Sequence, residues 1–363
     1  MIKVAEPYIE QDEIDAAVQV LLSGNYISGK EVAAFEEEFA RYVGTKYAIA
    51  CNSGTAALHM VLKSLGIGPG DRIIVPDMSF FATASAVLMT GAVVDFADVD
   101  SNCNISAGSI RDLIKPNTKA IIPVHLYGMP CDMIDIMKVA EEYNLFVIED
   151  CAQAHGAEYR GKKVGSFGIA NCFSFFATKN MTTIEGGIIT TDEKYVHKAC
   201  NLLRSHGMID RNTHTVLGYN YRMTEVNAAI GRIQLGKLGM LNAKRINNSN
   251  YLTKGLHSKY IKPFLKFDPG IKKPVYFWFP VEVSFAIDKV MEILRENGIG
   301  FRHRYYKPLH TQPLFRGAYD HVKNSISEYY SARVLGLPNH PGLTKNDLDV
   351  VLDVINRYDP FGE

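Results

Sequence analysis

The first half of the chain alternates short apolar runs with longer stretches in which apolar residues recur every three or four positions. In "EVAAFEEEFARYV", Val32, Phe35, Phe39 and Tyr42 follow at steps of three, four and three, which places them on one face of a helix. The run "YAIAC" and the helical "SGTAALHMVLKSLGI" come next, and the alternation continues through "RIIVP", "VVDFADVD", "AIIPVHLYG" and "LFVIED". This order predicts β-α units and a mostly parallel central sheet flanked by helices, an α/β fold.

The pattern changes after Glu185. The stretch "EVNAAIGRIQLGKLGMLNAKRINNSNYL" has the length of one long connecting helix. Beyond it, the strand-like "VYFWFPVEV" and the helix-like "AIDKVMEILRENGI" and "TKNDLDVVLDVINRY" predict a smaller α/β unit. The length of 363 residues also fits two domains, because a single core usually takes roughly 100 to 200 residues. We therefore expect a large domain over residues 1–245 and a small C-terminal domain over residues 246–363.

Composition argues against several classes of function. The 39 basic residues balance the 39 acidic ones, which leaves no electrostatic case for binding nucleic acid or an anionic membrane. No apolar run approaches the roughly 18 to 20 residues of a membrane span, and "MIKVAEPYIEQDE" lacks an apolar signal region. The six cysteines stand singly, with no C-x-x-C pair and no histidine cluster at ligand spacing, so we expect neither a metal site nor disulfides. A reducing cytoplasm fits this cysteine usage best.

Three predicted strand ends carry polar residues, and ligands of parallel sheets bind at the carboxyl ends of the strands. The first is "CNSGTAAL", in which Ser53, Gly54 and Thr55 lead from a strand into a helix. Unpaired backbone N–H groups and the helix dipole at such a start favour an anion such as a phosphate group. The plain alternative is that Ser53 only caps the helix.

The second strand end is "LFVIEDCAQAHG". Its buried apolar run ends in Glu149 and Asp150, with Gln153 and His155 close behind. A carboxylate in this position costs desolvation free energy unless a cation faces it. A pyridinium nitrogen would serve as that cation, and a structural ion pair or a helix cap explains this stretch equally well.

The third is "CFSFFATKNMTTIEGG", where Lys179 stands between an aromatic run and a glycine pair with no other charge before Glu185. A lysine amine, a carboxylate and a phosphate cradle are together what pyridoxal 5'-phosphate (PLP) requires, because its aldehyde forms a Schiff base with lysine. Phe80 or Phe81 in "PDMSFFATASAV" could stack on the ring of this cofactor. The phosphate cradle at Ser53 to Thr55, the carboxylate of Asp150 and the amine of Lys179 each follow a predicted strand of the β-α chain. This order predicts a PLP site.

The basic stretch "FRHRYYKPLH" has two readings. It is either a solvated loop or a binding site for an anionic substrate, and the sequence leaves both open.

From end to end, the chain resembles the DegT-type sugar aminotransferases, PLP enzymes of aminotransferase fold type I. The segments that carry this resemblance are "SGNYISGKEVAAFEEEFA", "NSGTAAL", "PDMSFFATASAVLMTGA", "VIEDCAQAHGA", "GSFGIANCFSFFATKNMTTIEGG", "LGYNYRMTEVNAAIG" and "YYKPLH". The resemblance implies a large PLP-binding domain and a smaller C-terminal α/β domain.

The same resemblance implies a role for each matching residue. Lys179 would form the Schiff base and later act as general acid and base, and Asp150 would pair with the pyridine nitrogen. Gln153 would contact the ring hydroxyl, and Phe80 would stack on the ring. The residues implied to hold the phosphate are Gly54, Thr55, Ser174 and, from the neighbouring subunit of a homodimer, Asn220.

The implied reaction moves an amino group from glutamate or glutamine to a nucleotide-linked keto-deoxyhexose, with Tyr305 and His310 near the substrate. Two alternatives stay open: transamination of a non-nucleotide cyclic ketone, and a PLP-binding regulatory protein without turnover. Related dehydratases have histidine where this chain has Lys179, so transamination is favoured. Many members read Gly-Glu-Gly-Gly where this chain has Ile184 before Glu185, and we expect the backbone to adjust there.

Overall fold

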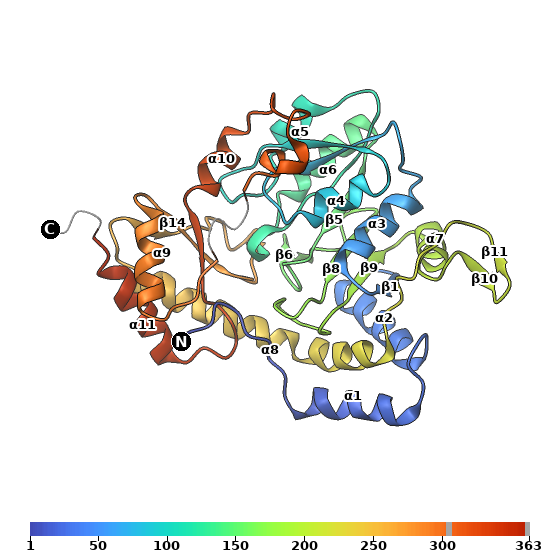
Figure 1. Cartoon of the computed structure of the whole chain (residues 1–363), viewed down its shortest axis with the longest axis horizontal. Coiled ribbons are helices and arrows are strands. Elements are labelled where there is room, and N and C mark those ends of the chain that lie inside the picture. The colour runs from blue at the N-terminus through green and yellow to red at the C-terminus, as the bar shows by residue number, and fades with distance from the viewer. Residues whose placement is uncertain (303–306, 360–363) are drawn as a thin grey trace.

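The computed structural model describes residues 1–302 and 307–359 and has a mostly parallel sheet of seven strands at its centre (Figure 1). The strand order is β1-β9-β8-β5-β4-β2-β3, in which only β9 runs antiparallel to its neighbours β1 and β8. The strands are β1 (Tyr47–Cys51), β2 (Arg72–Pro76), β3 (Val93–Ala97), β4 (Thr118–Ile121), β5 (Phe146–Asp150), β8 (Ala170–Ser174) and β9 (Gly187–Thr191). The predicted α/β fold class is confirmed.

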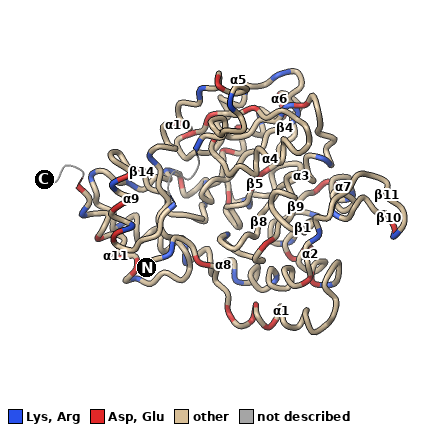
Figure 2. The backbone as a smooth tube through the Cα atoms, viewed as in Figure 1, with Lys and Arg blue, Asp and Glu red and all other residues tan. Residues whose placement is uncertain are grey.

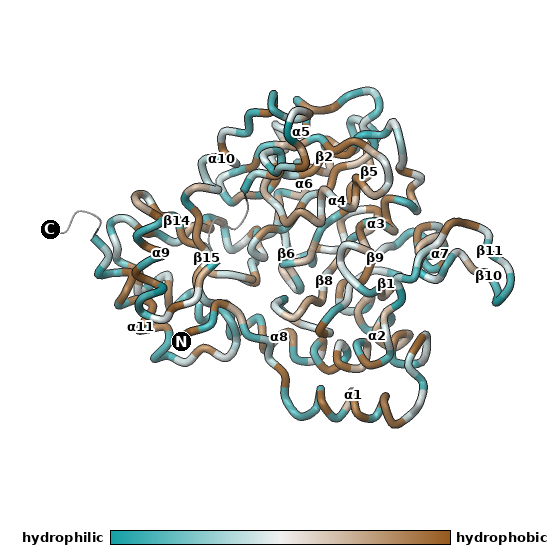
Figure 3. Tube along the Cα trace, viewed as in Figure 1, coloured by the Kyte–Doolittle hydropathy of each residue, from teal (hydrophilic) through white to brown (hydrophobic). Residues whose placement is uncertain are grey.

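Both faces of this sheet are covered by helices. Ile73 and Val75 of β2 share a core with α3 and α4, whereas Ile74 between them faces α5 and α6 on the other side. A strand buried on both faces needs an unbroken apolar run, which explains the strand sequences and the hydrophobic centre seen in Figure 3. The helices around the sheet are α3 (Gly54–Ser64), α4 (Ala82–Leu88), α5 (Ala107–Leu113), α6 (Met133–Tyr143) and α7 (Lys194–Arg204).

The predicted long helix is α8 (Glu225–Gly255), which is continuous over 31 residues. It runs below the sheet in Figure 1, with α1 (Gln11–Ser23) and α2 (Lys30–Val43) packed beside it. Between α7 and α8 the hairpin of β10 (Met208–Asp210) and β11 (Thr213–His214) projects from the body. The helix therefore connects the two ends of the molecule.

The C-terminal part forms a second, antiparallel sheet in the order β12-β14-β15. Its elements are β12 (Ile261–Pro263), β14 (Phe279–Val283), α9 (Ile287–Glu296), α10 (Ser325–Ser331), β15 (Val334–Leu337) and α11 (Lys345–Asn356). A third small sheet joins β6 (Glu158–Tyr159) and β7 (Lys162–Lys163) to β13 (Lys272–Lys273). The smaller α/β unit expected from the sequence is present.

Segments cross between the two units in both directions. The N-terminal Ile2 pairs with Ile299, and the ring of Phe315 packs 5.0 Å from that of Phe96 at the central sheet. The predicted boundary between residues 245 and 246 falls inside α8. The division into domains 1–245 and 246–363 stays a prediction.

Charged residues of both signs are interspersed along the whole trace (Figure 2). No helix in the described part of the chain is long and apolar enough to cross a membrane. The cytoplasmic location stays a prediction.

A buried carboxylate fastens the start of α2 to the start of α8. Glu225 accepts hydrogen bonds from the backbone N–H groups of Gly29 (2.8 Å), Glu31 (2.9 Å) and Val32 (3.2 Å). The first N–H groups of a helix have no partner within the helix and carry its positive dipole end, so an anion there is stabilising. A Cβ atom on Gly29 would lie 2.6 Å from Oε2 of Glu225, which explains the glycine.

We predict that Glu225→Gln lowers the free energy of unfolding by about 1–3 kcal/mol, because an NH₂ group replaces one of the accepting oxygens and leaves buried donors unpaired. Urea denaturation measures the change. Glu37→Gln, which removes an exposed ion pair with Arg41, is the control and should change stability by less than about 0.5 kcal/mol. Equal stability of the two variants would contradict the assignment.

Candidate active site

The three strand ends singled out in the sequence meet at one edge of the central sheet. Asp150 at the end of β5 pairs with Cys172 of β8, and Ser174 ends β8. A Cβ atom on Gly54 would lie 2.9 Å from Cβ of Ser174, so the start of α3 is directly beside the end of β8. A Cβ atom on Gly187 would lie 2.7 Å from the Gly54 nitrogen. The structure therefore brings Gly54 and Ser174 together in a cradle without room for larger side chains.

Ser53 caps α3, as the plain alternative proposed. Its side chain accepts a hydrogen bond from Ala56 N at 3.1 Å. Within residues 1–302 and 307–359, no acceptor pairs with the backbone N–H of Gly54 or Thr55. The cap thus uses one donor of the helix start and leaves these two N–H groups available to an anion, as an anion site requires.

Asp150 is buried and firmly oriented. Its Oδ1 accepts from Ala152 N at 3.1 Å and its Oδ2 from the Thr83 hydroxyl at 2.9 Å. Burial raises the pKa of this carboxyl group, against the opposing effects of both hydrogen bonds and of the Lys179 charge. A cation at this carboxylate would offset the cost of burial.

Lys179 lies in the turn after β8, with Nζ 4.7 Å from the centre of the Phe277 ring. The residue as a whole is partly exposed, but its amine is desolvated. This desolvation lowers the pKa of Lys179 to about 8, although the Asp150 carboxylate acts in the opposite direction. A far larger share of this amine is therefore neutral and nucleophilic near pH 8 than in an ordinary lysine.

Gln153 and His155 follow Asp150 into the interior. The Gln153 side-chain oxygen accepts from Tyr127 N at 2.8 Å and holds a turn in which Tyr127 has a φ of 58°. His155 is fully buried between the rings of Phe173 and Phe175, and burial lowers its pKa to about 3. The His155 ring is therefore neutral.

The remaining predicted site residues are more dispersed. Phe80 is 63% exposed just before α4, on the segment that also carries Thr83. The backbone oxygen of Asn220 accepts from Asn52 Nδ2 at 3.3 Å, which puts it near the start of α3 in its own chain. Its predicted reach into a second subunit stays a prediction.

His310 is buried against Asp77, with Nδ1 2.6 Å from Oδ2 and its backbone N–H 2.9 Å from Oδ1. The hydrogen bond to Asp77 raises the pKa of His310. His310 therefore fastens its segment to the end of β2, and its contact with substrate stays a prediction. Tyr305 lies outside the described residues.

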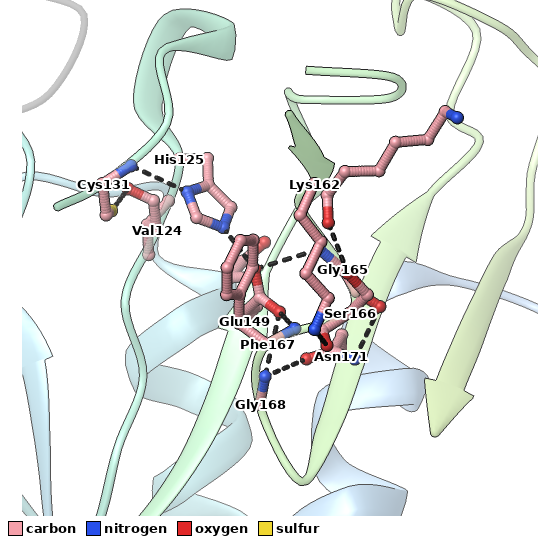
Figure 4. Close-up of polar contacts among 12 residues, drawn as sticks. Val124, His125, Cys131, Glu149, Lys162, Gly165, Ser166, Phe167, Gly168 and Asn171 are labelled. Carbon is pink, nitrogen blue, oxygen red and sulfur yellow. Dashed lines mark hydrogen bonds and ion pairs between the residues drawn. The ribbon is translucent and has the colours of Figure 1, made fainter. Parts of the chain in front are cut away.

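Glu149, next to Asp150, is not itself at the cradle but anchors this edge of the sheet (Figure 4). It accepts from His125 Nε2 (2.9 Å) and from the backbone N–H groups of Gly165 (2.9 Å), Phe167 (2.6 Å) and Gly168 (3.0 Å). Burial acts to raise the Glu149 pKa, but these hydrogen bonds outweigh it and leave the pKa below its usual value. The sequence left three roles open for the carboxylates at this strand end: a partner of a pyridinium nitrogen, a structural ion pair or a helix cap. The contact of Glu149 with His125 is closest to the structural pair.

The cluster also fixes the tautomer of His125. Its Nδ1 accepts from Cys131 N at 3.0 Å, so Nδ1 carries no proton and Nε2–H donates to Glu149. The His125 backbone N–H donates to the Asp150 oxygen (3.1 Å), and Asp150 N donates to the Pro123 oxygen (2.8 Å). Glu149 therefore stabilises the stretch of backbone that carries Asp150. Sequence reasoning missed this role because three of the four donors are backbone groups and the fourth, His125, is distant in the sequence.

Ile184 has a φ of 72° and is 56% exposed. Positive φ is costly for a β-branched residue, on the order of 1–3 kcal/mol. Hydrogen bonds from Ile184 N to Thr182 Oγ1 (2.7 Å) and from Asn227 Nδ2 to the Glu185 oxygen (2.9 Å) hold the turn. The backbone at Ile184 thus adopts a glycine-like conformation.

The model of the DegT/DnrJ/EryC1/StrS aminotransferase family matches residues 7–356. The chain belongs to this family. It is 39% identical to the GDP-perosamine synthase of Caulobacter vibrioides, over 98% of both chains. It is 38% identical to the UDP-N-acetyl-3-dehydro-alpha-D-glucosamine 3-aminotransferase of Acidithiobacillus ferrooxidans, over 96% of this chain and 94% of that one.

Among solved structures, the PLP form of Streptococcus pneumoniae Spr1654 superposes with a TM-score of 0.92 at 26% identity, covering 98% of this chain and 97% of that one. This DegT/DnrJ/EryC1/StrS member is accordingly a PLP-dependent aminotransferase with the expected fold. The cradle at Gly54, the unpaired N–H groups of α3, the buried Asp150 and the desolvated Lys179 fit the phosphate, ring nitrogen and aldehyde of PLP.

We predict that PLP uptake by the cofactor-free enzyme follows the ionisation of Lys179. Only a neutral amine attacks an aldehyde, and a folded-state pKa lowered to about 8 makes the neutral fraction rise up to pH 8 and level off above it. Stopped-flow absorbance in the visible band of the protein-bound cofactor measures the rate. A rate that kept rising through pH 10 would show an ordinary lysine.

Proposed function

We propose that this enzyme transfers an amino group from glutamate or glutamine to a nucleotide-linked keto-deoxyhexose and so makes an amino sugar nucleotide. The observation that carries the proposal is the desolvated amine of Lys179 at the strand-end cluster of Asp150 and the phosphate cradle. The names of two relatives, a GDP-perosamine synthase and a UDP-sugar 3-aminotransferase, favour a nucleotide sugar over a non-nucleotide cyclic ketone. The presence of lysine at position 179 favours turnover over a purely regulatory role.

The cofactor would be held at four points. Asp150 would face its ring nitrogen and keep that nitrogen protonated, and Gln153 and Phe80 would contact the ring. Lys179 would bind its aldehyde carbon. The groups that would hold its phosphate in this chain are the N–H groups of Gly54 and Thr55 and the side chains of Thr55 and Ser174.

PLP, when bound, supplies an electron-withdrawing ring that makes the α-proton of an attached amino acid acidic. The chain supplies the base, since Lys179 Nζ with a pKa of about 8 can accept this proton near neutral pH and later donate it. Asp150, held by Thr83 and Ala152, keeps its carboxylate at one fixed position throughout. The Phe277 ring beside Nζ covers the amine and limits its contact with water.

We predict that glutamate or glutamine bleaches the yellow cofactor band of the purified enzyme and that a keto-sugar nucleotide restores it. Lys179→Ala should slow turnover by at least about 10³-fold, because the variant loses its acid-base group. Lys30→Ala, which removes an exposed lysine amine, serves as control and should keep the parent rate. Turnover by Lys179→Ala within tenfold of the parent would refute the assignment of Lys179.

We propose further that the enzyme is a homodimer in which Asn220 of one subunit reaches the phosphate held by the other. Mixing inactive Lys179→Ala and Asn220→Ala subunits tests this, because a mixed dimer then has one intact site. An equal mixture should recover about a quarter of the parent activity, since half of the dimers are mixed and each has one intact site of two. If Asn220 serves the site of its own chain, where it lies near Asn52, no activity returns.

A further inference from the structure

Thr83 connects two of the segments that form the candidate site. It is 1% exposed and lies in the first turn of α4. Its hydroxyl donates to Oδ2 of Asp150 at 2.9 Å, and its backbone N–H donates to the oxygen of Phe80 at 3.1 Å. One residue therefore joins the carboxylate predicted to pair with the ring nitrogen to the aromatic residue predicted to stack on the ring.

A second buried hydroxyl stands behind the first. Ser79 is also 1% exposed, and its Oγ lies 2.7 Å from Oγ1 of Thr83. An ionised carboxylate has no proton to give, so Thr83 must donate its only hydroxyl proton to Asp150. Ser79 must then donate to Thr83. The two hydrogen bonds therefore have a fixed direction, from Ser79 through Thr83 to Asp150.

Asp150 has few donors for a buried carboxylate. In the described part of the chain, its Oδ1 accepts only from Ala152 N and its Oδ2 only from Thr83. The neighbouring Glu149 accepts from four donors, and its pKa lies below the usual value, whereas burial raises the pKa of Asp150. A carboxylate offers about four lone-pair sites, so Asp150 keeps sites open for a donor outside the polypeptide.

The segment that carries Ser79 is itself anchored. Two residues earlier, the buried carboxylate of Asp77 accepts from the backbone and ring of His310 and from Nδ2 of Asn324. The backbone N–H of Asp77 donates to the Ala97 oxygen at 2.9 Å. The hydroxyl pair therefore approaches the Asp150 carboxylate from a fixed base.

We propose that Ser79 and Thr83 are positioning residues that keep Asp150 ionised and directed at the ring nitrogen of the cofactor, so that this nitrogen stays protonated. The inference rests on the role of Asp150 in the proposed function. A hydroxyl suits this task because it donates to the carboxylate without a charge of its own, which would compete with the ring nitrogen. Both hydroxyls act through Asp150.

The test compares two cofactors on the enzyme freed of its own. PLP carries the ring nitrogen, and its 1-deaza analogue has a carbon in that place but keeps the aldehyde and the phosphate. Calorimetry at one pH measures the affinity of each. The informative quantity is the ratio of the two affinities, because the analogue lacks the atom that would pair with Asp150.

Four variants separate the hydroxyls from the packing. Thr83→Val removes the hydroxyl and keeps the shape, Thr83→Ser keeps the hydroxyl, and Ser79→Ala removes the second donor. Thr90→Val is the matched control, because Thr90 is also buried and its hydroxyl donates to the Val87 oxygen at 2.7 Å.

We expect the preference for PLP over its analogue to fall about tenfold in Thr83→Val and about threefold in Ser79→Ala, because the charged carboxylate loses a donor or the neighbour that polarises this donor. Thr83→Ser should keep the parent preference within about twofold, since its hydroxyl can make the same hydrogen bonds. Thr90→Val should leave the preference unchanged. Bleaching of the cofactor band by glutamate should slow most in Thr83→Val.

A hydroxyl with a merely structural role would weaken both cofactors equally and lower the melting temperature. An unchanged preference in Thr83→Val would therefore overturn the proposal. A parent enzyme that binds both cofactors equally would overturn it together with the proposed contact of Asp150. Failure of the proposed reaction has a different signature: neither glutamate nor glutamine bleaches the parent band, while the affinity ratio still depends on Thr83 and supports the positioning role.

Discussion

The buried carboxylate of Glu149 is the interaction on which the active edge of the sheet depends. Its hydrogen bonds fix the loop at residues 165–168 and, through the neutral ring of His125, the segment at residues 124–131. The backbone of His125 and Asp150 is paired, so the same cluster determines where the Asp150 carboxylate lies. The carboxylate that we propose to face the cofactor, that of Asp150, is therefore held in place by the neighbouring carboxylate of Glu149.

Buried carboxylates that accept from backbone N–H groups also join other distant segments. Glu225 accepts from the first N–H groups of α2, and Asp98 accepts from Ile326 and Ser327 at the start of α10. Asp77 receives both the ring and the backbone of His310. Hydrogen bonds from backbone N–H groups offset the desolvation cost of burying each carboxylate. The carboxylate is satisfied only when the partner segment lies beside it, so the interaction specifies which two segments come together.

Apolar periodicity predicted the parallel sheet, the long helix and the strand ends, because each is a local pattern of a few residues. Glu149 has no such pattern. Three of its four donors are backbone N–H groups at residues 165–168, which no side-chain motif marks, and the fourth is His125, which is distant in the sequence. The pairing of Ile2 with Ile299 and the return of Phe315 to the central sheet are likewise non-local, so no sequence window shows them.

The continuity of α8 has a mechanical consequence. At about 1.5 Å per residue, its 31 residues form a rod about 46 Å long. Asn227 and Asn242 connect this rod to the turn of Lys179, and Asn248 connects it to His340 after β15. The turn of Lys179 and the C-terminal unit are therefore attached to the same rigid helix. Loops elsewhere around the site can change in sequence without displacing that turn. Such an arrangement lets acceptor specificity evolve separately from the chemistry of amine uptake.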